Sequence, residues 1–523
     1  MISLDVAIYN ASIYTMNPAR PQAEAVGIRG NSILIVGSNK EIESLCSGST
    51  KRIDAHGKVL LPGFIDAHTH FRLMGIRMDN YLDLTSVSSK RELLNRLTAF
   101  AAEKRRGDWI VGTGWDESKW SGDRTFITRE EIDAAVSHLP VALERIDCHL
   151  FCVNTQALNR LELDGSVRGF EIAEGTPTGR LFEDATAHVR KAIKPNQEQI
   201  VSGIKRAVKY AHQHGVTSIH QMVVEEEEFK DDLKAYQRLW RADQLGVRAR
   251  LYFTPNYLDE MIALGLSSGF GDSTLRIGGL KLFSDGSIGS KTAWVTEGYR
   301  DDPTNHGMSI WDRGELESLV KRADENDIQV AIHAIGTEAL EQVITTLEAV
   351  LAKGKKAPLR HRIEHDEMLT SDQIQRMQRL QLIASMQPNF TGQWGLPNAM
   401  YEQRFGKERI ETINPLRSVV DAGVPVAFGS DCMPFGPLYG IHWAVNAAFA
   451  AQRLSVAEAV RAYTLGAAFA GHAEQQVGSI EPGKLADLIL LDGDPYAEPA
   501  RIKDMAVQTT VFDGRIVYQA DDE

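Results

Sequence analysis

The stretch GFIDAHTHF, Gly63–Phe71, begins like a buried β-strand and ends in two histidines, His68 and His70, that are one residue apart. On an extended strand, residues two apart project from the same face, so both imidazoles could bind one metal ion. A second such pair, His212 and His214, falls near the end of an expected helix, where residues two apart point about 200° away from each other. Only the first pair therefore predicts a metal site.

Seven further strand-like runs follow and alternate with helical segments, which is the pattern of a parallel sheet with crossover helices. With the first run they are VLLPGFIDAH, VTSIHQM, VRARLYF, IGGLKLFSDG, IQVAIHAIG, RHRIEHDE, LIASMQP and VPVAFGSD. Eight strands close a (β/α)8 barrel. The predicted fold class is therefore α/β, with a TIM-like barrel over residues 61–474.

The two ends of the chain differ from this alternating centre. LDVAIYNASIYTM and NSILIVGS near the start, and KLADLILLDGDP and TTVFDGRIVYQ near the end, are short strand-like runs with Gly and Asn turns. We expect residues 1–60 and 475–523 to form one small β-sandwich domain together. A long gap after the first barrel strand predicts an inserted subdomain at about 72–195 over the barrel mouth, including a helix with a capping box at Ser89 and Glu92 and an end at Gly107.

Composition limits the partners and the location. The 523 residues are 43% hydrophobic and carry a formal net charge of −13, so no basic surface suggests nucleic acid or an anionic membrane. We expect a small-molecule substrate. The first residues have no basic region followed by an apolar core, and no run approaches the roughly 18 apolar residues of a transmembrane helix, so a cytoplasmic protein is expected. The four scattered cysteines are interpreted as free thiols. The oligomeric state is open, with a homodimer as one option.

Four more polar residues lie near the ends of later predicted strands: Lys281 of the fourth, His333 of the fifth, His365 of the sixth and Asp431 of the eighth. In a barrel these strand ends open onto one face, where active sites are built. Together with the first histidine pair, six nitrogen and oxygen groups would converge on one rim. Neutral imidazole and carboxylate suit Zn²⁺ and similar divalent ions.

These segments resemble the amidohydrolase superfamily, and within it the branch that includes N-substituted formamide deformylases and uncharacterised metal-dependent hydrolases. PGFIDAHTH is similar to the first-strand motif, KLFSDGSIGSKTA to the lysine segment, HAIG and RIEHDE to the later histidine segments, and GSD to the eighth-strand aspartate. GTGWDES, RIDCHLFCVNTQAL, GRLFEDA and GSIEPGKLADLILLDGDP extend the resemblance over nearly the whole chain. One departure is Thr337, where relatives commonly have Asp.

The resemblance implies a two-metal site. His68, His70 and Asp431 would hold one divalent ion, His333 and His365 would hold the second, and a Lys281 carboxylated by CO2 would bridge them as a carbamate. Zn²⁺ is expected, with Mn²⁺, Co²⁺ or Fe²⁺ as alternatives. A hydroxide shared by the metals would be the nucleophile, and Asp431 would be the catalytic acid and base.

Other residues are candidates with a structural alternative. His220, at the end of the second strand, could bind substrate or orient a ligand, or it could be a satisfied histidine behind the site. Asp285 could support the metal ligands or shape a turn, and Trp115 could line the pocket or pack in the insert. His361 is expected to be structural, and the acidic run at 225–228 to be a solvated segment.

The predicted activity is hydrolysis of a carbon–nitrogen bond other than a peptide bond, with an N-substituted amide or formamide as substrate. One alternative is an aminohydrolase that releases ammonia from a heterocycle, although such deaminases usually use one metal and no bridging lysine. An alternative of another class is a catalytically silent regulatory relative. The presence of all six ligand types argues against it.

Overall fold

Eight parallel strands form the central sheet of the computed structural model, which describes residues 3–105, 107–223, 229–352 and 359–520. The acidic run at 225–228 lies outside these residues. The sheet order is β21-β20-β19-β18-β17-β16-β15-β8, so neighbours in the chain are neighbours in the sheet. The strands are β8 Phe64–Thr69, β15 Val216–Met222, β16 Arg248–Phe253, β17 Leu275–Phe283, β18 Val330–Ala334, β19 Arg362–His365, β20 Ile383–Met386 and β21 Val426–Phe428. Each overlaps one predicted run, which confirms the α/β class and the TIM-like barrel.

The first predicted strand is divided in two, which corrects the prediction. Its first half is β7 (Val59–Pro62), which pairs antiparallel with β22 (Leu488–Leu491) in a separate sheet. Gly63 lies between the halves, at a close approach to β15 where a Cβ would lie 2.4 Å from the Thr217 hydroxyl oxygen. The chain passes from one sheet to the other at this residue. Both halves are fully buried and each begins with apolar residues, so the local hydrophobic pattern could not divide them.

Contacts between the first and last barrel strands bring their carboxyl ends together. The backbone N–H of Asp431, three residues after β21, donates to the His68 carbonyl at 2.9 Å. Beside it, the Ser430 hydroxyl donates to Asp66 at 2.5 Å, and the Ser430 N–H donates to the same carboxylate at 2.9 Å. The two edge strands of the sheet, β8 and β21, are thereby joined at their carboxyl ends.

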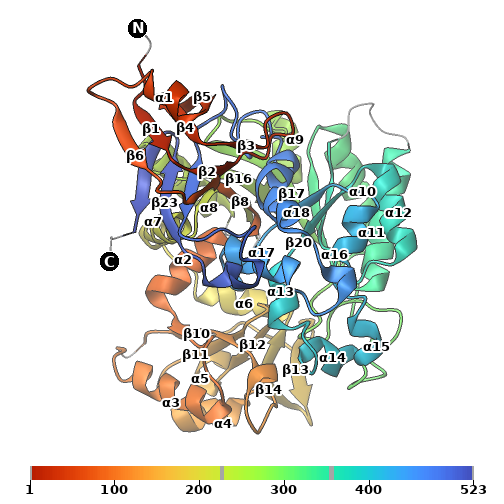
Figure 1. Cartoon of the computed structure of the whole chain (residues 1–523). Helices are drawn as coiled ribbons and strands as arrows, with labels where there is room; N and C mark the ends of the chain where they lie inside the picture. The colour runs from red at the N-terminus through yellow and green to blue at the C-terminus, as the bar shows by residue number, and fades with distance from the viewer. Residues whose placement is uncertain (1–2, 106, 224–228, 353–358, 521–523) are drawn as a thin grey trace.

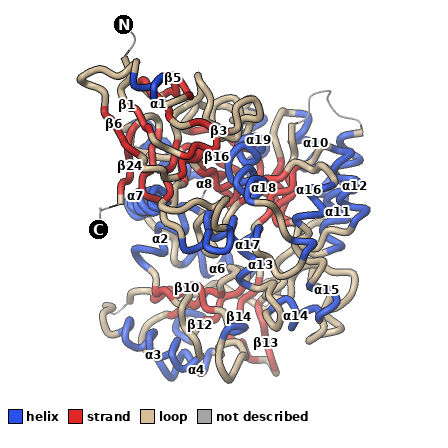
Figure 2. The backbone as a smooth tube through the Cα atoms, in the orientation of Figure 1, coloured by secondary structure: helices blue, strands red, loops and turns tan. Residues whose placement is uncertain are grey.

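The crossover helices cover the outside of the barrel, and α10, α11, α12 and α16 form one of its walls (Figures 1 and 2). In α7, buried Ile200, Ile204, Ala207 and Ala211 follow helical spacing and join the main apolar core. The main helices are α7 Gln197–Gln213, α8 Phe229–Arg241, α9 Leu258–Leu264, α10 Arg313–Glu325, α11 Thr337–Leu351, α12 Ser371–Leu380, α13 Pro388–Gln393, α14 Met400–Phe405, α15 Lys407–Ile410, α16 Leu416–Asp421, α17 Pro437–Val445, α18 Val456–Arg461 and α19 Ala467–Ala470. No helix of the described residues is long and apolar enough to cross a membrane.

Strands from both ends of the chain lie together beside the barrel (Figure 1). One sheet has the order β5-β4-β1-β6 and the other β24-β23-β22-β7-β2-β3. The additional strands are β1 Val6–Tyr9, β2 Ser12–Tyr14, β3 Gln22–Ala23, β4 Ala25–Arg29, β5 Ser32–Gly37, β6 Lys51–Asp54, β23 Val507–Phe512 and β24 Arg515–Gln519. Arg248 of β16 links this part to the barrel through two hydrogen bonds, of 2.7 and 2.8 Å, to the buried Asp487 carboxylate.

The segment between β8 and β15 carries its own six-stranded sheet, of order β13-β14-β12-β11-β10-β9. Its elements are α2 Phe71–Asn80, β9 Leu82–Asp83, α3 Lys90–Ala101, β10 Ile110–Trp115, α4 Arg129–Ala135, β11 Val141–Arg145, β12 Leu150–Val153, α5 Thr155–Leu158, β13 Phe170–Ala173, β14 Thr176–Phe182 and α6 Asp184–Ala192. We call this segment the insert. Figure 1 shows its sheet and α3–α5 on the opposite side of the molecule from the terminal sheets.

Helix α3 begins where the sequence predicts, because the Ser89 side chain accepts from the Glu92 N–H. The Glu92 carboxylate, however, accepts from Ser88 rather than from Ser89. The helix also ends at Ala101 instead of near Gly107. Beyond it the backbone tightens into turns in which the N–H of each residue from 102 to 104 bonds the carbonyl three residues earlier.

Candidate metal centre

His68 and His70 meet the Asp431 carboxylate at the carboxyl end of β8. The Nε2 atoms of His68 and His70 lie 3.7 and 3.0 Å from the same oxygen, Oδ1, of Asp431. His68 is fully buried, and the His70 side chain is 13% exposed. Asp431 adopts a positive φ of 52°, which is uncommon for a residue other than glycine. Two side chains from the first strand and one from the last thus face one point.

His333 and His365 lie beside this group at the ends of β18 and β19. Their ring centroids are 4.4 Å apart, and the His365 ring is 4.8 Å from that of His68. His365 has a φ of 79°, so the chain leaves the extended conformation at this residue. Burial lowers the pKa values of His68, His333 and His365 well below the usual value. The imidazoles are therefore neutral and keep a lone pair for a metal ion.

Lys281 of β17 is buried and lines the same cavity as the histidines. Its Nζ has no hydrogen-bond partner among the described residues, and it lies 4.5 Å from the centroid of the Phe283 ring. If Lys281 had a purely structural role, a salt bridge to Asp285 or Glu364 would be expected. Neither contact is found among the described residues. Burial lowers the pKa of Lys281 to about 8.

Hydrogen bonds fix which nitrogen each imidazole presents. His68 Nδ1 donates to Glu364 at 2.7 Å and His70 Nδ1 donates to the Met222 carbonyl at 3.0 Å, so each keeps Nε2 for a ligand. His333 is reversed, because its Nε2 donates to the Gly286 carbonyl at 3.0 Å and leaves Nδ1. Such partners orient metal-binding histidines and raise their basicity.

A chain of buried hydrogen bonds runs from His68 into the barrel. Glu364 accepts from Arg362 at 2.8 and 3.0 Å, and Arg362 also bonds His220 Nδ1 at 2.7 Å and the Tyr252 hydroxyl at 3.1 Å. Two side chains, Glu364 and Arg362, therefore lie between His68 and His220. His220 is not among the described residues that line the larger cavity. Its substrate-binding alternative is not supported. Glu364 was not among the candidates from the sequence.

Asp285 supports the loop that follows β18 instead of facing the cavity. Its carboxylate accepts from the backbone N–H groups of Trp294, Ile335 and Gly336 at 2.8–3.1 Å. It also lies 3.5 Å from His333 Nε2. Burial raises its pKa to about 7. Thr337, the residue that departs from the family pattern, bonds Thr296 at the start of α11.

Trp115 packs inside the insert, which is one of its two predicted roles, and it is not among the described residues that line the larger cavity. It is fully buried in an apolar cluster with Trp120 and Leu143, and its indole N–H donates to the Leu143 carbonyl at 3.1 Å. Three other histidines discussed above also have structural contacts. His212 and His214 bond different carbonyl groups, and His361 bonds Asp324 at 3.1 Å.

The insert instead contributes residues of the turn between β11 and β12. Cys148 has a φ of 63°, and the turn carries Asp147 and His149 to the barrel mouth. His149 Nδ1 donates to Glu183 at 2.8 Å, and its ring centroid lies 5.8 Å from that of His333. Burial alone would lower the pKa of His149, but the charge of Glu183 and the hydrogen bond to it raise the pKa to about 9.

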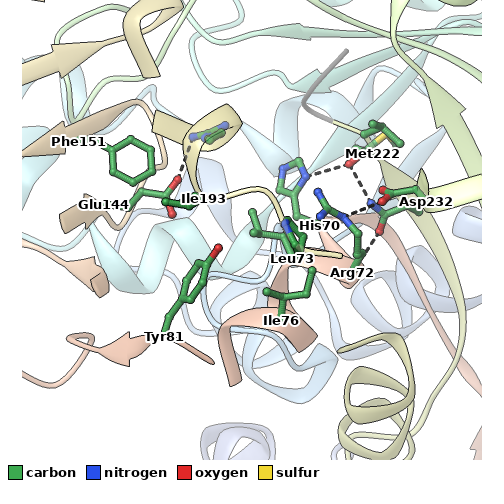
Figure 3. A pocket seen from close by; sticks show the side chains of 14 residues that line it. His70, Arg72, Leu73, Ile76, Tyr81, Glu144, Phe151, Ile193, Met222 and Asp232 are labelled. Atoms are coloured by element: carbon green, nitrogen blue, oxygen red, sulfur yellow. Dashed lines mark hydrogen bonds and ion pairs between the residues drawn. The ribbon is translucent and has the colours of Figure 1, made fainter. Parts of the chain in front are cut away.

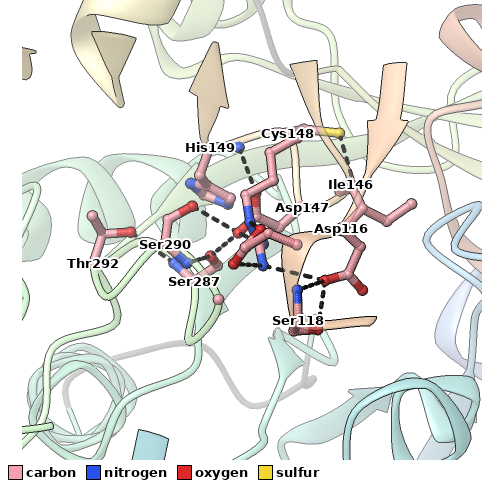
Figure 4. Close-up of polar contacts among 12 residues, drawn as sticks. Asp116, Ser118, Ile146, Asp147, Cys148, His149, Ser287, Ser290 and Thr292 are labelled. Carbon is pink, nitrogen blue, oxygen red and sulfur yellow. Dashed lines mark hydrogen bonds and ion pairs between the residues drawn. The ribbon is translucent and has the colours of Figure 1, made fainter. Parts of the chain in front are cut away.

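Buried polar contacts attach this turn to the barrel (Figure 4). The Asp147 carboxylate accepts from the hydroxyl groups of Ser287 and Ser290, both at 2.7 Å, and from Arg145 at 2.7 Å. Arg145 also forms a two-point contact with Glu117 at 2.9 and 3.0 Å. The two serines belong to the loop after β17, so the insert and the lysine strand are held in one arrangement.

Two cavities of different size meet at the candidate ligands. The larger has a volume of about 730 Å³ and is lined by all six predicted ligand residues and by residues of α6. The smaller has a volume of about 40 Å³ and lies against His333, His365 and Asp431. Its apolar lining includes Ile288, Ile335, Phe390, Trp394, Met400 and Met433. His149 lines both cavities.

A third cavity, of about 30 Å³, borders His70 and is lined both by the insert and by residues of β15 and α8 (Figure 3). Leu73, Ile76 and Tyr81 form its apolar lining. An ion pair of 3.0 Å between Arg72 and Asp232 closes one side. Since the Nδ1 of His70 bonds the Met222 carbonyl here, this cavity lies behind the imidazole and the histidine presents Nε2 to the larger cavity.

The donor set fits a divalent metal ion. His68, His365 and Asp431 each offer a ligand atom within 4.8 Å of the others. His68 Nε2 is buried without a hydrogen-bond partner among the described residues, as expected of an atom that binds an ion. Two ligand atoms on one tetrahedral zinc ion lie about 3.3 Å apart, given bonds of about 2.0–2.1 Å. The distances of 3.0 and 3.7 Å to Asp431 lie on either side of this value.

Comparisons with known proteins match hydrolases along nearly the whole chain. Residues 51–518 match the model of the "Amidohydrolase family". The Bacillus subtilis protein YtcJ is 30% identical over 97% of this chain and 98% of its own length, and the N-substituted formamide deformylase of Arthrobacter pascens is 27% identical over 98% of both. The crystal structure of an uncharacterized metal-dependent hydrolase from Pyrococcus furiosus superimposes with a TM-score of 0.75 at 30% identity, over 94% of this chain and 99% of that one.

Proposed function

The chain belongs to the amidohydrolase family, and from this premise we propose that it hydrolyses an N-substituted amide or formamide. The observation that carries the proposal is the convergence of imidazole, carboxylate and amine groups from five barrel strands on one cavity. Chemistry at a barrel mouth is assigned from such side chains and not from the fold alone.

We propose two divalent ions, of which Zn²⁺ is the expected species. His68, His70 and Asp431 would hold one ion, and His333 and His365 the other. Lys281 would bridge them as a carbamate, and its buried, unpartnered Nζ supports this role. When bound, two such ions lower the pKa of water and polarise a carbonyl group.

Asp431 is the proposed proton carrier. Its Oδ1 atom lies 3.0 Å from His70 Nε2, and the residue lines both cavities, so the carboxylate is within reach of the attacking water and of the substrate nitrogen. It would accept a proton as the water attacks and deliver it to the departing nitrogen. Delivery matters because an amine leaves readily only when protonated.

The unequal cavities favour a small acyl group and a larger amine. A space of about 40 Å³ holds a few non-hydrogen atoms, since about 10–15 Å³ on the same scale holds one water molecule. A formyl or acetyl group fits there, against Phe390 and Trp394. The adjoining space of about 730 Å³, which shares His333, His365 and Asp431 with the smaller one, would accommodate the nitrogen substituent. The comparison with a formamide deformylase supports the same substrate class.

A hydrolysis screen of the metal-loaded enzyme tests the proposal. The screen includes N-formyl amines, N-acetyl amines, N-acyl amines with long chains, cyclic amides, carbamates and esters, with metal content measured in parallel. We expect the highest kcat/KM on N-formyl or N-acetyl compounds with a bulky amine. Release of ammonia from heterocycles alone would favour the aminohydrolase alternative. Full metal loading without turnover of any class would contradict the proposal.

A further inference from the structure

His149 and Glu183 form a largely buried pair at the larger cavity, and the proposed function gives this pair no role. Both come from the insert, His149 from the turn between β11 and β12 and Glu183 from the start of α6. His149 Nδ1 donates to one carboxylate oxygen of Glu183 at 2.8 Å. The two side chains are 15% and 8% exposed, so water screens their charges little.

Glu183, the partner of His149, has a strained backbone conformation. It has a φ of 40° and a ψ of −113°, a conformation that a residue other than glycine rarely adopts. Residues in such conformations cost about 1–3 kcal/mol and cluster at functional sites. Its second oxygen, Oε1, is buried and has no hydrogen-bond partner among the described residues. This carboxylate therefore relies on the His149 imidazole for compensation.

A close approach to the barrel fixes the position of the pair. A Cβ on Gly286 would lie only 2.5 Å from Glu183 Oε1, so a side chain at position 286 would push the carboxylate away. Gly286 is also the residue whose carbonyl accepts from His333 Nε2 at 3.0 Å. One glycine thus touches both the candidate ligand His333 and the insert carboxylate.

One ring nitrogen of His149 remains available to a molecule bound in the cavities. With Nδ1 bonded to Glu183, the remaining polar atom is Nε2, which makes no hydrogen bond in the described part of the chain. The residue lines both the large and the small cavity, and its ring lies 5.8 Å from that of His333. A carbonyl group placed between the two cavities would therefore lie beside Nε2.

We infer that His149 is a catalytic residue that donates a hydrogen bond from Nε2 to the carbonyl oxygen of the substrate, and that Glu183 is its positioning residue. This inference rests on the proposed function. As the water oxygen bonds the carbonyl carbon, the π electron pair moves to the carbonyl oxygen, and His149 stabilises the resulting negative charge without transferring a proton. When the carbon–nitrogen bond breaks, the pair returns to the carbonyl, and the nitrogen leaves with a proton delivered by Asp431.

A matched pair of substitutions separates this role from a structural one. His149→Asn keeps a donor near the position of Nδ1 and can still bond Glu183, but it does not reach the cavity. His149→Gln keeps a donor near the position of Nε2. Loss of an oxyanion donor typically lowers kcat by about 10² to 10³. We expect this loss in H149N with unchanged metal content, and recovery of at least tenfold in H149Q. A structural role predicts the reverse order.

Glu183→Gln tests the positioning role. It should lower kcat about tenfold with KM changed less than threefold, and the double variant H149N/E183Q should be no slower than H149N within a factor of three, because the two residues act as a unit. The control is His138→Asn, which replaces an exposed histidine of the insert and should retain wild-type kcat. If the kcat of the double variant falls by the product of the two single losses, Glu183 does not act through His149 and its positioning role is overturned.

A binding measurement keeps the inference testable if the proposed function fails. Formate, whose oxygens resemble a charged carbonyl oxygen, is titrated calorimetrically into metal-loaded wild type and H149N. If wild type hydrolyses no amide, the proposed function fails, and a tenfold weaker affinity of H149N for formate would still support the contact. The inference is overturned if kcat of H149N, or its formate Kd where no substrate is turned over, stays within threefold of wild type. Loss of metal in H149N would also overturn it.

Discussion

Replacing Glu364 by Gln should weaken metal binding although it removes no ligand. The fully buried Glu364 carboxylate accepts from His68 Nδ1 at 2.7 Å and from Arg362 at 2.8 and 3.0 Å. A glutamine amide has one accepting oxygen and one donating nitrogen. Since both neighbours are donors, one of these contacts would set a donor against a donor, and His68 would lose its orientation or its partner.

The expected size of the effect follows from these contacts. Loss of a hydrogen-bond partner behind a metal ligand typically lowers metal affinity about 10- to 100-fold, which corresponds to about 1.4–2.7 kcal/mol. The substitution also leaves the Arg362 charge buried without its carboxylate, and breaking a buried pair costs about 3–5 kcal/mol of folding stability. Glu364→Gln should therefore raise the metal Kd and lower the Tm of the metal-free protein.

Asp324→Asn is the matched control, because Asp324 also accepts from a buried histidine, His361, at 3.1 Å. This pair does not line the cavity. The control should lose stability but keep its metal Kd within about threefold. Affinities are measured by competition with a chromophoric chelator for Zn²⁺, and Tm by circular dichroism. The reasoning is refuted if folded Glu364→Gln binds metal within twofold of wild type, or if both variants weaken binding equally.

Three shorter predictions concern the ligands. Purified enzyme should contain about two divalent ions per chain, and a chelator should abolish activity that Zn²⁺, Mn²⁺ or Co²⁺ restores; full activity of verified metal-free protein would exclude a metal-dependent reaction. Asp431→Asn should lower kcat at least about 10²-fold in a folded, metal-loaded protein, because it removes the proton acceptor; near-normal kcat would assign proton transfer to another group. Crystals of native enzyme should show three extra atoms on Lys281, and Lys281→Ala should lose metal; an unmodified lysine in metal-loaded enzyme would exclude the carbamate.

The barrel strands could be predicted because each is a short apolar run bounded by turn residues. Such runs identify strands by local pattern, and their alternation with helices identifies a parallel sheet. The division at Gly63 could not be predicted. Val59–Pro62 and Phe64–Thr69 are both fully buried, and they belong to different sheets because they pair with different distant strands, β22 and β15. Pairing of this kind is not encoded in local hydrophobicity.

The alternation of side chains along a strand explains part of the candidate site. His68 and His70 are two apart on an extended end and both face Asp431, as that period requires. The same rule fails at β19, where Glu364 and His365 are adjacent and yet both reach His68, by a 2.7 Å hydrogen bond and by a ring distance of 4.8 Å. The positive φ of His365 turns its side chain away from the strand period. No pattern of residue types predicts that turn.

The position of His149 at the cavity was the least predictable feature of the site. It depends on how the sheet of the insert packs against the barrel. RIDCHLFC and GRLFEDA contributed to the family resemblance, but the sequence does not reveal the docking contacts, such as those of Asp147 with Ser287 and Ser290, that hold the turn of His149 at the cavity. The candidate ligands, by contrast, are positioned by the barrel itself, through the contact between the Asp431 N–H and the His68 carbonyl. Ligand geometry and cavity shape thus depend on different parts of the chain. Substitutions in the insert can therefore change which substrate fits while the metal ligands keep their arrangement.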